Sequence, residues 1–450
     1  MKAIVLAAAM MFGAVAGGAA GGRGGEPIGP RLAPAIEVDG VRLAVPTKEQ
    51  AAWHDLEIGM FVHIAPQTWQ DTETDTMKTP LSEIDPAKLD TDQWVRVAKS
   101  MGAKYLVFVA KHEGGFCWWP TATTDYSVKS IPWRGGRGDV MKDLAASCKA
   151  AGIGLGVYLS PQDKKHKAAV GGKVADEAGQ KAYEAIFRAQ LTELLTQYGE
   201  MMEVWFDGSL VFDVGDILAE HAPGAMVFQG PQATIRWVGN EDGFVPAGNA
   251  WNTVKRGVKE WGQYTADEGD PAGDAWLPNE ADARIRSTWF WKTNNLNTLK
   301  SLADLVSMYE KSVGRGAVLL LNHTPDRSGL IPEEDAARAA EFGAAIEATY
   351  GTAVSSSSGR GKEVVTQPSA AVVVDRVVLM EDIRQGERVR KYAVDVQGAD
   401  GTWKTVATGT AIGRKRIEAI PRGEVSAVRL RVLESVGEPI IARVSLHRTR

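Results

Sequence analysis

The stretch Glu203-Val-Trp-Phe-Asp-Gly-Ser209 is the most suggestive of chemistry, because an apolar strand pattern ends in one carboxylate just before a glycine. In an alternating β/α barrel the C-terminal strand ends face the active site, so Asp207 would be held on rigid backbone and point into a cleft. Asp207 is therefore the first candidate for a catalytic nucleophile. An Asp-Gly pair after a strand can equally begin an ordinary turn, and this short stretch alone does not separate the two interpretations.

Three other expected strand ends carry polar side chains that could bind a polyhydroxylated ligand. The first strand ends at His63, the second at His112 and Glu113, and the third at Tyr158. A lone histidine is more often a satisfied structural residue than a ligand contact. Four strand ends in register, each bearing a hydrogen-bonding side chain, favour a shared binding site.

Tryptophan is abundant around these strand ends, and the chain has 14 of them in 450 residues. The indole face packs against the apolar face of a sugar ring while its N–H stays free to donate. We expect Trp53 and Trp94 to be ordinary core residues. The tryptophans that stand near the expected site are Trp69, Trp118, Trp119, Trp205, Trp237, Trp251 and Trp289.

A glycosidase that retains anomeric configuration needs two carboxylates, one to attack the anomeric carbon and one to protonate the leaving oxygen. Asp207 fits the first role. For the second, Glu241 and Glu280 both fall in expected long loops, from which a carboxylate could reach across the cleft. Glutamates in loops usually face solvent and have no catalytic role. Glu241 and Glu280 are therefore candidates only because Asp207 would need a second carboxylate.

Apolar runs and helical periodicity alternate along the first two thirds of the chain. This order predicts a parallel sheet with right-handed crossovers, and the continuous apolar runs predict strands buried on both faces, as in a barrel. Weak periodicity between residues 231 and 297 predicts long loops over the active face. The expected strands are 59–64, 105–110, 154–159, 203–206, 225–229 and 317–321, and the expected helices are 91–101, 139–150, 176–198 and 299–313.

A Ser/Gly tract at residues 355–361 predicts a flexible boundary between two domains. Beyond it, short β-branched runs separated by Gly and Pro predict a β-sandwich. The fold class is thus α/β, a (β/α)8 barrel of the TIM type over residues 48–352 that is irregular in its second half, followed by a sandwich over residues 353–450. We expect the sandwich to buttress the barrel.

The N-terminus has a lysine at position 2, an apolar run to about Ala16 and then small residues, which is the pattern of a secretory signal. We expect a signal peptide over residues 1–20, an arm over residues 21–47, and a secreted or periplasmic protein. No later run of about eighteen apolar residues follows, so we expect no membrane span. The net charge of -5 leaves no basic surplus for a nucleic-acid partner.

The cysteines and histidines give no sign of a metal site. Cys117 and Cys148 are the two cysteines, and their spacing matches neither a metal site nor a disulfide framework, so we expect two free, buried thiols. The seven histidines contain no His-x-His pair and no His-Glu-x-x-His segment. We expect neither a catalytic metal nor another cofactor.

From about residue 53 to the C-terminus the chain resembles the α-L-fucosidases of glycoside hydrolase family 29, in the branch of 1,3/1,4-linkage type that carries a C-terminal β-sandwich. The ordered set of motifs is specific. It comprises Gly59-Met-Phe-Val-His63, Lys111-His112, Gly115-Phe-Cys-Trp-Trp-Pro120, Gly138-Asp-Val140, Gly156-Val-Tyr-Leu-Ser-Pro161, Glu203-Val-Trp-Phe-Asp-Gly208, Trp237-Val-Gly-Asn-Glu241, Leu319-Leu-Leu-Asn322 and Pro325-Asp326.

The resemblance implies a β/α barrel and a retaining, double-displacement mechanism that needs no cofactor. The family's nucleophile falls on Asp207 and the acid/base glutamate of this branch on Glu241, with Glu280 in reserve. It also implies a sugar pocket lined by several of the residues above. The expected substrate-binding residues are His63, Glu73, His112, Glu113, Trp119, Tyr158, Trp205, Trp237 and Trp289.

Three positions depart from the family pattern. The family commonly has two consecutive histidines where this chain has His112-Glu113, a tryptophan at Thr74 and a glycine at Ala65. A carboxylate near a sugar hydroxyl only accepts hydrogen bonds and repels an anionic substituent. We therefore hypothesise that Glu113 alters the preference for the sugar or the linkage.

Together these features predict an exo-glycosidase that removes terminal α-L-fucosyl residues from oligosaccharides or glycoconjugates. One alternative is a glycosidase for a related α-L-sugar such as L-galactose, which differs from L-fucose by one hydroxyl that a hydrophobic pocket rejects weakly. The other alternative is a catalytically weak carbohydrate-binding protein that keeps the barrel and its aromatic cleft.

Overall fold

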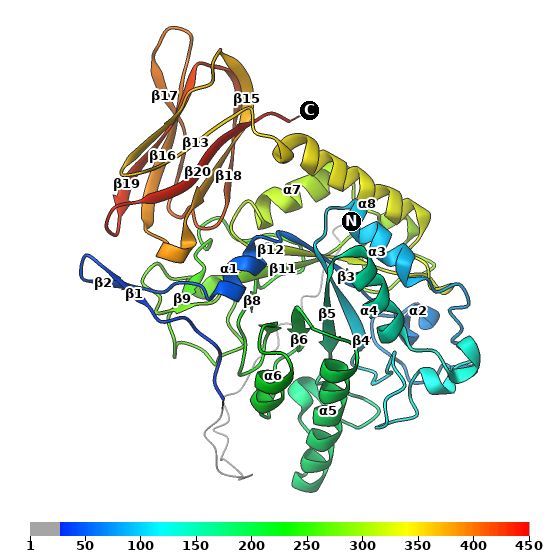
Figure 1. Ribbon diagram of the computed structural model, residues 1–450. Helices are drawn as coiled ribbons and strands as arrows, with labels where there is room; N and C mark the ends of the chain where they lie inside the picture. Colours follow the sequence, from blue (N-terminus) through cyan, green and yellow to red (C-terminus); the bar gives the residue numbers. More distant parts are fainter. Residues whose placement is uncertain (1–27, 450) are drawn as a thin grey trace, which may run out of the picture.

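The computed structural model describes residues 28–449 (Figure 1). Its centre is a parallel sheet of eight strands in the order β7-β6-β5-β4-β3-β12-β11-β8. An isolated parallel bridge between Phe228 and Ile235 brings the two edge strands together, so the sheet curls into a barrel. The expected fold class is confirmed. The predicted signal peptide lies outside the described residues.

Six of the eight barrel strands coincide with the predicted apolar runs to within about two residues. Every residue of β3 and β4 is buried, as expected for strands covered on both faces. The strands are β3 (Ile58–Val62), β4 (Tyr105–Lys111), β5 (Gly154–Leu159), β6 (Glu203–Trp205), β7 (Met226–Phe228), β8 (Arg236–Trp237), β11 (Asn279–Arg284) and β12 (Val318–His323).

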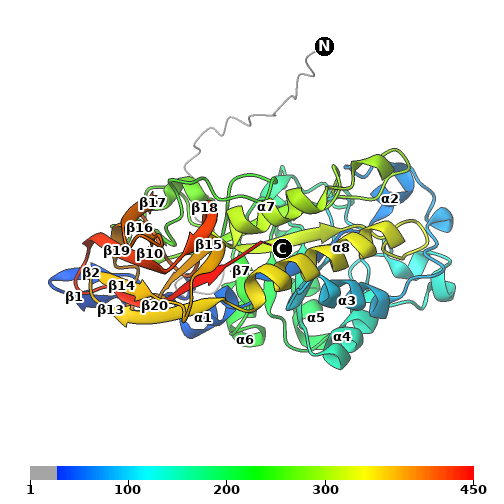
Figure 2. The ribbon, with the colours of Figure 1, turned by 90° about the horizontal axis from the view of Figure 1, so that it is seen from above.

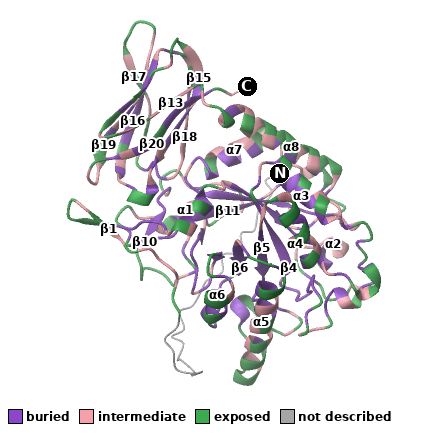
Figure 3. Ribbon diagram, in the orientation of Figure 1, coloured by how far each residue is buried: buried purple, intermediate pink, exposed green. Residues whose placement is uncertain are grey.

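Helices cover the outside of the barrel, with buried faces inward and exposed faces outward (Figure 3). The four predicted helices begin at caps: the carboxylates of Asp90, Asp139 and Asp176 accept from first-turn amides, and Ser301 and Asp304 form a capping box. Helices α1, α2, α6 and α8 were not predicted. The helices are α1 (Lys48–His54), α2 (Pro66–Gln70), α3 (Thr91–Ser100), α4 (Val140–Ala151), α5 (Glu177–Gln197), α6 (Gly215–His221), α7 (Leu302–Ser312) and α8 (Glu333–Ile346).

The second half of the barrel is irregular, as expected. No helix joins β7 to β8, and the chain from β8 to β11 makes a long excursion that includes the short strands β9 (Thr253–Val254) and β10 (Ala275–Trp276). The prediction that Glu280 lies in a loop is wrong, because residues 279–284 form β11, a strand paired on both sides. Its side chains are acidic or basic on one face, and on the other they are Asn279 and two alanines, so no apolar run marks the strand.

Beyond the barrel, two four-stranded antiparallel sheets face each other across a core of Val, Ile and Leu, as predicted for a sandwich. The prediction of a flexible tract at residues 355–361 is wrong. Most of this tract forms strand β13, which pairs with β20, a strand far along the chain. The sheets are β13-β20-β15-β18 and β14-β19-β16-β17. The strands are β13 (Ser355–Arg360), β14 (Glu363–Thr366), β15 (Val372–Glu381), β16 (Val389–Gln397), β17 (Trp403–Gly409), β18 (Arg416–Val425), β19 (Ala427–Ser435) and β20 (Ile440–His447).

The sandwich packs beside the barrel, close to α7 and the β8–β11 excursion (Figure 2). The Ile417 amide donates to the Gly314 carbonyl at 2.9 Å, just after α7. The buried Glu387 carboxylate accepts from Asn252 Nδ2 at 2.9 Å, within the excursion. The sandwich therefore supports the loops of the barrel's second half directly.

The described part of the predicted N-terminal arm contains a small hairpin, β1 (Ile36–Val38) and β2 (Val41–Leu43). Within residues 28–449 no helix is both long and apolar enough to cross a bilayer. Cys117 and Cys148 are free and buried, as predicted.

Candidate active site

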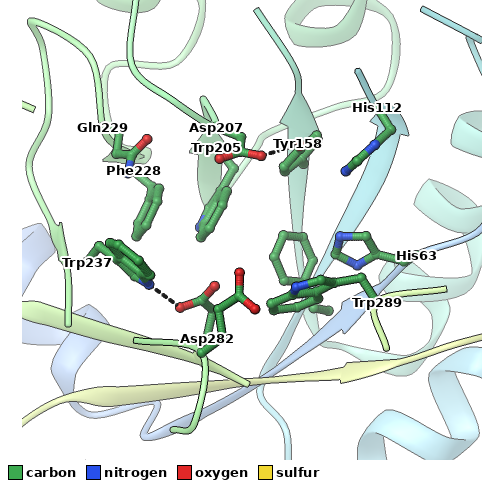
Figure 4. Close-up of a pocket in the computed structure, with 12 residues that line it drawn as sticks. His63, His112, Tyr158, Trp205, Asp207, Phe228, Gln229, Trp237, Asp282 and Trp289 are labelled. Carbon is green, nitrogen blue, oxygen red and sulfur yellow. Dashed lines mark hydrogen bonds between the residues drawn. The ribbon is translucent and has the colours of Figure 1, made fainter. Parts of the chain in front are cut away.

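The carboxyl ends of the barrel strands surround a cavity of about 250 Å³ (Figure 4). Eight of the predicted site residues line it, and they come from elements far apart in sequence. The lining residues are Phe61, His63, His112, Tyr158, Trp205, Asp207, Phe228, Gln229, Trp237, Glu241, Asp282 and Trp289.

Asp207 lies two residues beyond the end of β6, with its carboxylate at the cavity. The Tyr158 hydroxyl donates to Asp207 Oδ2 at 2.9 Å. Loss of water around the carboxylate raises the pKa of Asp207, and the charge of Glu241 raises it further. The hydrogen bond from Tyr158 lowers it. The turn interpretation and the site interpretation therefore hold together: the chain turns at this point, and the carboxylate faces the cavity.

The turn after Asp207 is fixed by Gln229, a cavity residue that sequence reasoning missed. Gly208 and Ser209 both have positive φ, 78° and 67°. Their amides donate to Gln229 Oε1 at 2.8 and 3.1 Å. Gln229 itself has a φ of 61°, which costs a non-glycine residue on the order of 1 kcal/mol. The two hydrogen bonds to Gln229 hold the turn after Asp207 in place despite this strain.

The two cavity histidines carry their protons on opposite nitrogens. Asn322 Nδ2 donates to the Trp289 carbonyl at 3.0 Å, which turns Asn322 Oδ1 toward His63 Nδ1 at 2.7 Å. His63 Nδ1 therefore carries the proton, and its Nε2 is left as an acceptor. Burial lowers the pKa of His63 well below its usual value, so the ring is neutral.

His112 has the other tautomer. Gln67 Nε2 contacts both Glu113 Oε1, at 3.3 Å, and His112 Nδ1, at 3.1 Å, and as an amide nitrogen it donates to each. His112 Nδ1 therefore accepts, and its Nε2–H is a donor. Burial lowers the pKa of His112 to about 3, helped by the charge of Lys164. The cavity thus offers one neutral imidazole acceptor and one neutral imidazole donor.

The floor of the cavity is aromatic, and Glu280 lies beneath it. Trp205 stacks on Phe228 with ring centroids 3.6 Å apart and an angle of 4°. Trp205 Nε1 donates to Glu280 Oε2 at 3.0 Å, and the Tyr105 hydroxyl donates to Glu280 Oε1 at 3.2 Å. Glu280, the reserve acid/base candidate, is fully buried and does not reach the cavity. Its carboxyl group holds the floor from below.

A second buried carboxyl group accompanies Glu280 in the barrel interior. Glu203 Oε2 accepts from Trp53 Nε1 at 3.0 Å, and the charge of Glu203 acts on Glu280. Burial raises the pKa of Glu203 to about 7, and burial together with the Glu203 charge raises that of Glu280 well above its usual value. The pair therefore retains a proton near neutral pH.

Glu241 and Asp282 stand together on the side of the cavity formed by β8 and β11. Glu241 Oε2 is 3.2 Å from Arg284 Nη1. Asp282 Oδ1 accepts from Trp237 Nε1 at 2.6 Å (Figure 4). Burial, then the charges of Glu241 and Glu280, raise the pKa of Asp282 well above its usual value.

Three predicted substrate-binding residues lie outside the cavity. Trp119 is buried, and its Nε1 donates to Glu193 Oε2 at 2.7 Å on α5. Glu73 Oε2 accepts from the Trp289 amide at 2.9 Å, so it positions a cavity residue from behind. Local sequence could not reveal these directions, because the partners come from other elements.

Glu113 is also turned away from the cavity. Its Oε1 accepts from the Asp75 amide at 2.6 Å, and its Oε2 pairs with Lys164 at 3.1 Å. The idea that Glu113 touches the sugar is therefore not supported by the geometry. Any influence on the sugar would pass through Gln67 to His112.

Phe61, Phe228 and Asp282 were missed along with Gln229. Asp282 had a readable signal, because it stands two residues after Glu280, and residues at that spacing share a strand face. Phe61 and Phe228 had no such signal, because both lie inside ordinary apolar runs. Within the described part of the chain, no group of three or more His, Cys, Asp or Glu side chains is arranged to hold a metal ion.

Comparisons with known proteins agree with this geometry. The family model described as Alpha-L-fucosidase matches residues 68–349. The chain is similar to a putative α-L-fucosidase 1 of Oryza sativa subsp. japonica, with 33% identity over 89% of this chain and 84% of the relative. The α-L-fucosidase 1 of Arabidopsis thaliana is 32% identical over 90% of this chain and 88% of the relative.

Two solved structures resemble the whole molecule. A putative α-L-fucosidase from Bacteroides thetaiotaomicron has a TM-score of 0.84 and 31% identity, covering 91% of this chain and all (100%) of that one. A mutant of a Ruminococcus gnavus fucosidase of glycoside hydrolase family 29, in complex with fucose, has a TM-score of 0.81 and 27% identity. The match covers 94% of this chain and 97% of that one.

Proposed function

Because this chain belongs to the α-L-fucosidase family, glycoside hydrolase family 29, we propose that it is a retaining exo-glycosidase that removes terminal α-L-fucosyl residues. The observation that carries the proposal is one small cavity lined by both Asp207 and Glu241. The relative that binds fucose supports the choice of sugar. The expected substrates are fucosylated oligosaccharides or glycoconjugates.

The proposed reaction has two steps. Asp207 attacks the anomeric carbon while Glu241 gives its proton to the leaving oxygen, which releases the aglycone and leaves a glycosyl ester on Asp207. Glu241, now a carboxylate, takes a proton from water as the water attacks the same carbon. Fucose leaves with its original configuration, and both carboxyl groups return to their starting states.

The remaining cavity residues would bind the sugar. His63 Nε2 accepts from one hydroxyl, His112 Nε2–H donates to another, and the indole faces pack against the apolar ring face. The cavity of about 250 Å³ is smaller than the pockets that hold drug-sized ligands, which favours a single terminal sugar and hence exo-action.

Two finer points extend the proposal. The C-terminal sandwich supports the 1,3/1,4-linkage type of the family, as the sequence resemblance implies. The signal-like N-terminus supports export to the periplasm or medium. Fucose release from α1,2-, α1,3-, α1,4- and α1,6-linked oligosaccharides tests the first point, and fractionation of cells that express the full chain tests the second.

The test of function is monosaccharide release from paired α-L-fucosylated and α-L-galactosylated oligosaccharides. Wild type should release fucose, and Asp207→Asn should be nearly silent. Asp216→Asn is a matched control, because Asp216 pairs with Arg188 at the surface, far from the cavity. Release of galactose alone would move the assignment to the related sugar, and binding without release would favour a carbohydrate-binding protein.

Azide rescue tests the two roles separately. Asp207→Ala with azide should form the β-fucosyl azide, whereas Glu241→Ala should form the α-fucosyl azide, because azide then replaces water on the intact intermediate. Asp282→Ala should give neither product. An α-azide from Asp282→Ala and none from Glu241→Ala would transfer the acid/base role to Asp282.

A further inference from the structure

Strand β11 presents a ladder of three ionisable side chains to the inside of the barrel. Glu280 lies beneath the cavity floor, Asp282 lines the cavity, and Arg284 follows at the next position on the same face. A strand rises about 3.3 Å per residue, so each step of the ladder is near 7 Å. Arg284 therefore stands at the rim, above the site of the proposed bond cleavage.

Arg284 has few partners for a guanidinium in such a position. Nη1 pairs with Glu241 Oε2 at 3.2 Å, and the group lies 5.4 Å from the centre of the Trp289 ring. Nε is buried and has no hydrogen-bond partner among the described residues, while 24% of the side chain stays exposed. Five N–H donors thus face a single acceptor, leaving capacity for another.

The neighbouring Arg286 shows what a purely structural arginine looks like in this segment. Its side chain is completely buried, and its donors reach Asp335 at 2.5 and 3.0 Å, Glu334 at 2.9 Å and two backbone carbonyls. Arg284 lacks such a shell, although it lies only two residues away. Its guanidinium is therefore available to a ligand.

Charged groups of both signs surround Arg284, so its own guanidinium, and not a net positive charge, is what an anion would meet. Burial raises the pKa of Asp282 well above its usual value, and Glu241 is the carboxyl group that contacts Arg284. Lys300 is close by, with its Nζ donating to the Arg284 carbonyl at 2.5 Å, and Lys292 pairs with Glu73 beside Trp289. Asp242 also lies near Lys300.

We propose that Arg284 forms a subsite for an anionic substituent, a carboxylate or a sulfate, on the leaving-group sugar. The position follows from Glu241, since the group that protonates the leaving oxygen must face the aglycone, and Arg284 touches it. A planar guanidinium binds carboxylate and sulfate oxygens through parallel N–H bonds. This inference rests on the proposed function and narrows its substrate class to fucosides of acidic sugars.

The test uses matched disaccharides that differ in one substituent. Fucose is linked to glucuronic acid, to 6-sulfated galactose, or to the neutral parent of each, and kcat/KM is measured for every one. Wild type should favour an acidic member over its parent by on the order of tenfold, the worth of one partly exposed charge-assisted pair. The two acidic arms distinguish a carboxylate from a sulfate ligand.

Variants of Arg284 should remove this preference. Arg284→Met should bring the ratio of acidic to neutral kcat/KM to about one, and Arg284→Lys should retain part of it, because an ammonium keeps the charge but loses the planar fork. Arg327→Met is the matched control: Arg327 also pairs with a carboxylate, that of Asp71, at 2.9 Å and lies over a tryptophan, but its carboxylate partner does not line the cavity, whereas Glu241, the partner of Arg284, does. It should leave the ratio unchanged.

Each outcome decides between the inference and the function on which it rests. Equal turnover of acidic and neutral fucosides by wild type would overturn the subsite and leave the fucosidase proposal standing. A preference that survives in Arg284→Met would assign the anion to another group and also overturn it. Failure to release fucose from any member would overturn the function and the subsite together.

Discussion

The two halves of the barrel reach the same cavity by different means. From β3 to β6 the strands are nearly continuous runs of buried apolar residues, and each presents its polar group at or just beyond its end. Strand β11 instead carries charged side chains along its whole inward face, and β8 has only two residues before a long excursion. One half is a hydrophobic scaffold with polar tips, and the other is a charged surface.

The difference shows where each half obtains its stability. Apolar strands are stabilised by burial against any apolar neighbour. The charged strand needs specific partners, which here are Trp205 for Glu280, Trp237 for Asp282 and Glu241 for Arg284. Removing a partner from such a group leaves a buried polar atom unsatisfied, which costs far more than trimming a methyl group. The charged half should therefore be the more sensitive to small chemical changes.

The largest effect on kcat is expected in the apolar half, at Asp207 just beyond the end of β6. Asp207→Asn keeps the shape of the side chain but removes the attacking oxygen, so kcat should fall on the order of 10⁴-fold. The Tyr158 hydroxyl can still donate to the amide oxygen, so the unfolding midpoint should move little. A variant that retains a tenth of the wild-type kcat would rule out Asp207 as the nucleophile.

The next prediction concerns the carboxyl pair that joins the two halves. Glu203 ionises near pH 4.5 when unfolded and near pH 7 when folded. Between these values the folded protein binds more protons, so the wild type loses stability as the pH rises. Glu203→Gln should remove that loss. The free energy of unfolding of the variant minus that of wild type should therefore increase by roughly 3 kcal/mol between pH 4.5 and pH 7.5.

Urea unfolding of both proteins at several pH values measures this gain. Glu177→Gln is the control, because Glu177 is exposed at the start of α5. A difference between wild type and Glu203→Gln that stays constant across the pH range would mean that Glu203 is not held protonated in the folded protein.

A smaller effect on kcat/KM is expected at Asp282, where two variants show whether the neutral or the charged carboxyl group is needed. If the neutral acid is the working form, Asp282→Asn should reproduce it, since the amide can accept from Trp237 and donate into the cavity. We expect kcat/KM within about threefold of wild type for Asp282→Asn and a loss of about 10- to 100-fold for Asp282→Ala, the worth of a hydrogen bond to an ionised or strongly polar group. Equal losses in both variants would show that a charged carboxylate is required.

The smallest effect is expected at Glu113, behind the apolar half. Its carboxylate does not reach the cavity, and a glutamine can still accept from the Asp75 amide. Glu113→Gln should therefore leave the ratio of α-L-fucoside to α-L-galactoside turnover within about twofold of wild type, because the changed atom faces Lys164 and not the sugar. A larger change in that ratio would revive a role for Glu113 in sugar preference.

Local patterns in the chain were enough to predict the apolar half and most of the candidate site. Continuous apolar runs marked β3 to β7 and β12, and the polar residues at their ends include Asp207, His63, His112 and Tyr158, all of which line the cavity. The reason is that burial on both faces of a parallel strand imposes apolar residues at every position, so the signal lies within the strand itself.

Only the tertiary structure decided what the charged and polar groups do. It made residues 279–284 a strand, moved Glu280 below the floor, turned Glu113 and Trp119 away, and set the opposite tautomers of the two histidines. Each of these outcomes depends on a hydrogen-bonding or ionic partner that lies far away in the sequence. An apolar side chain needs only to be buried, whereas a buried polar one needs a particular partner, and that partner exists only once the chain has folded.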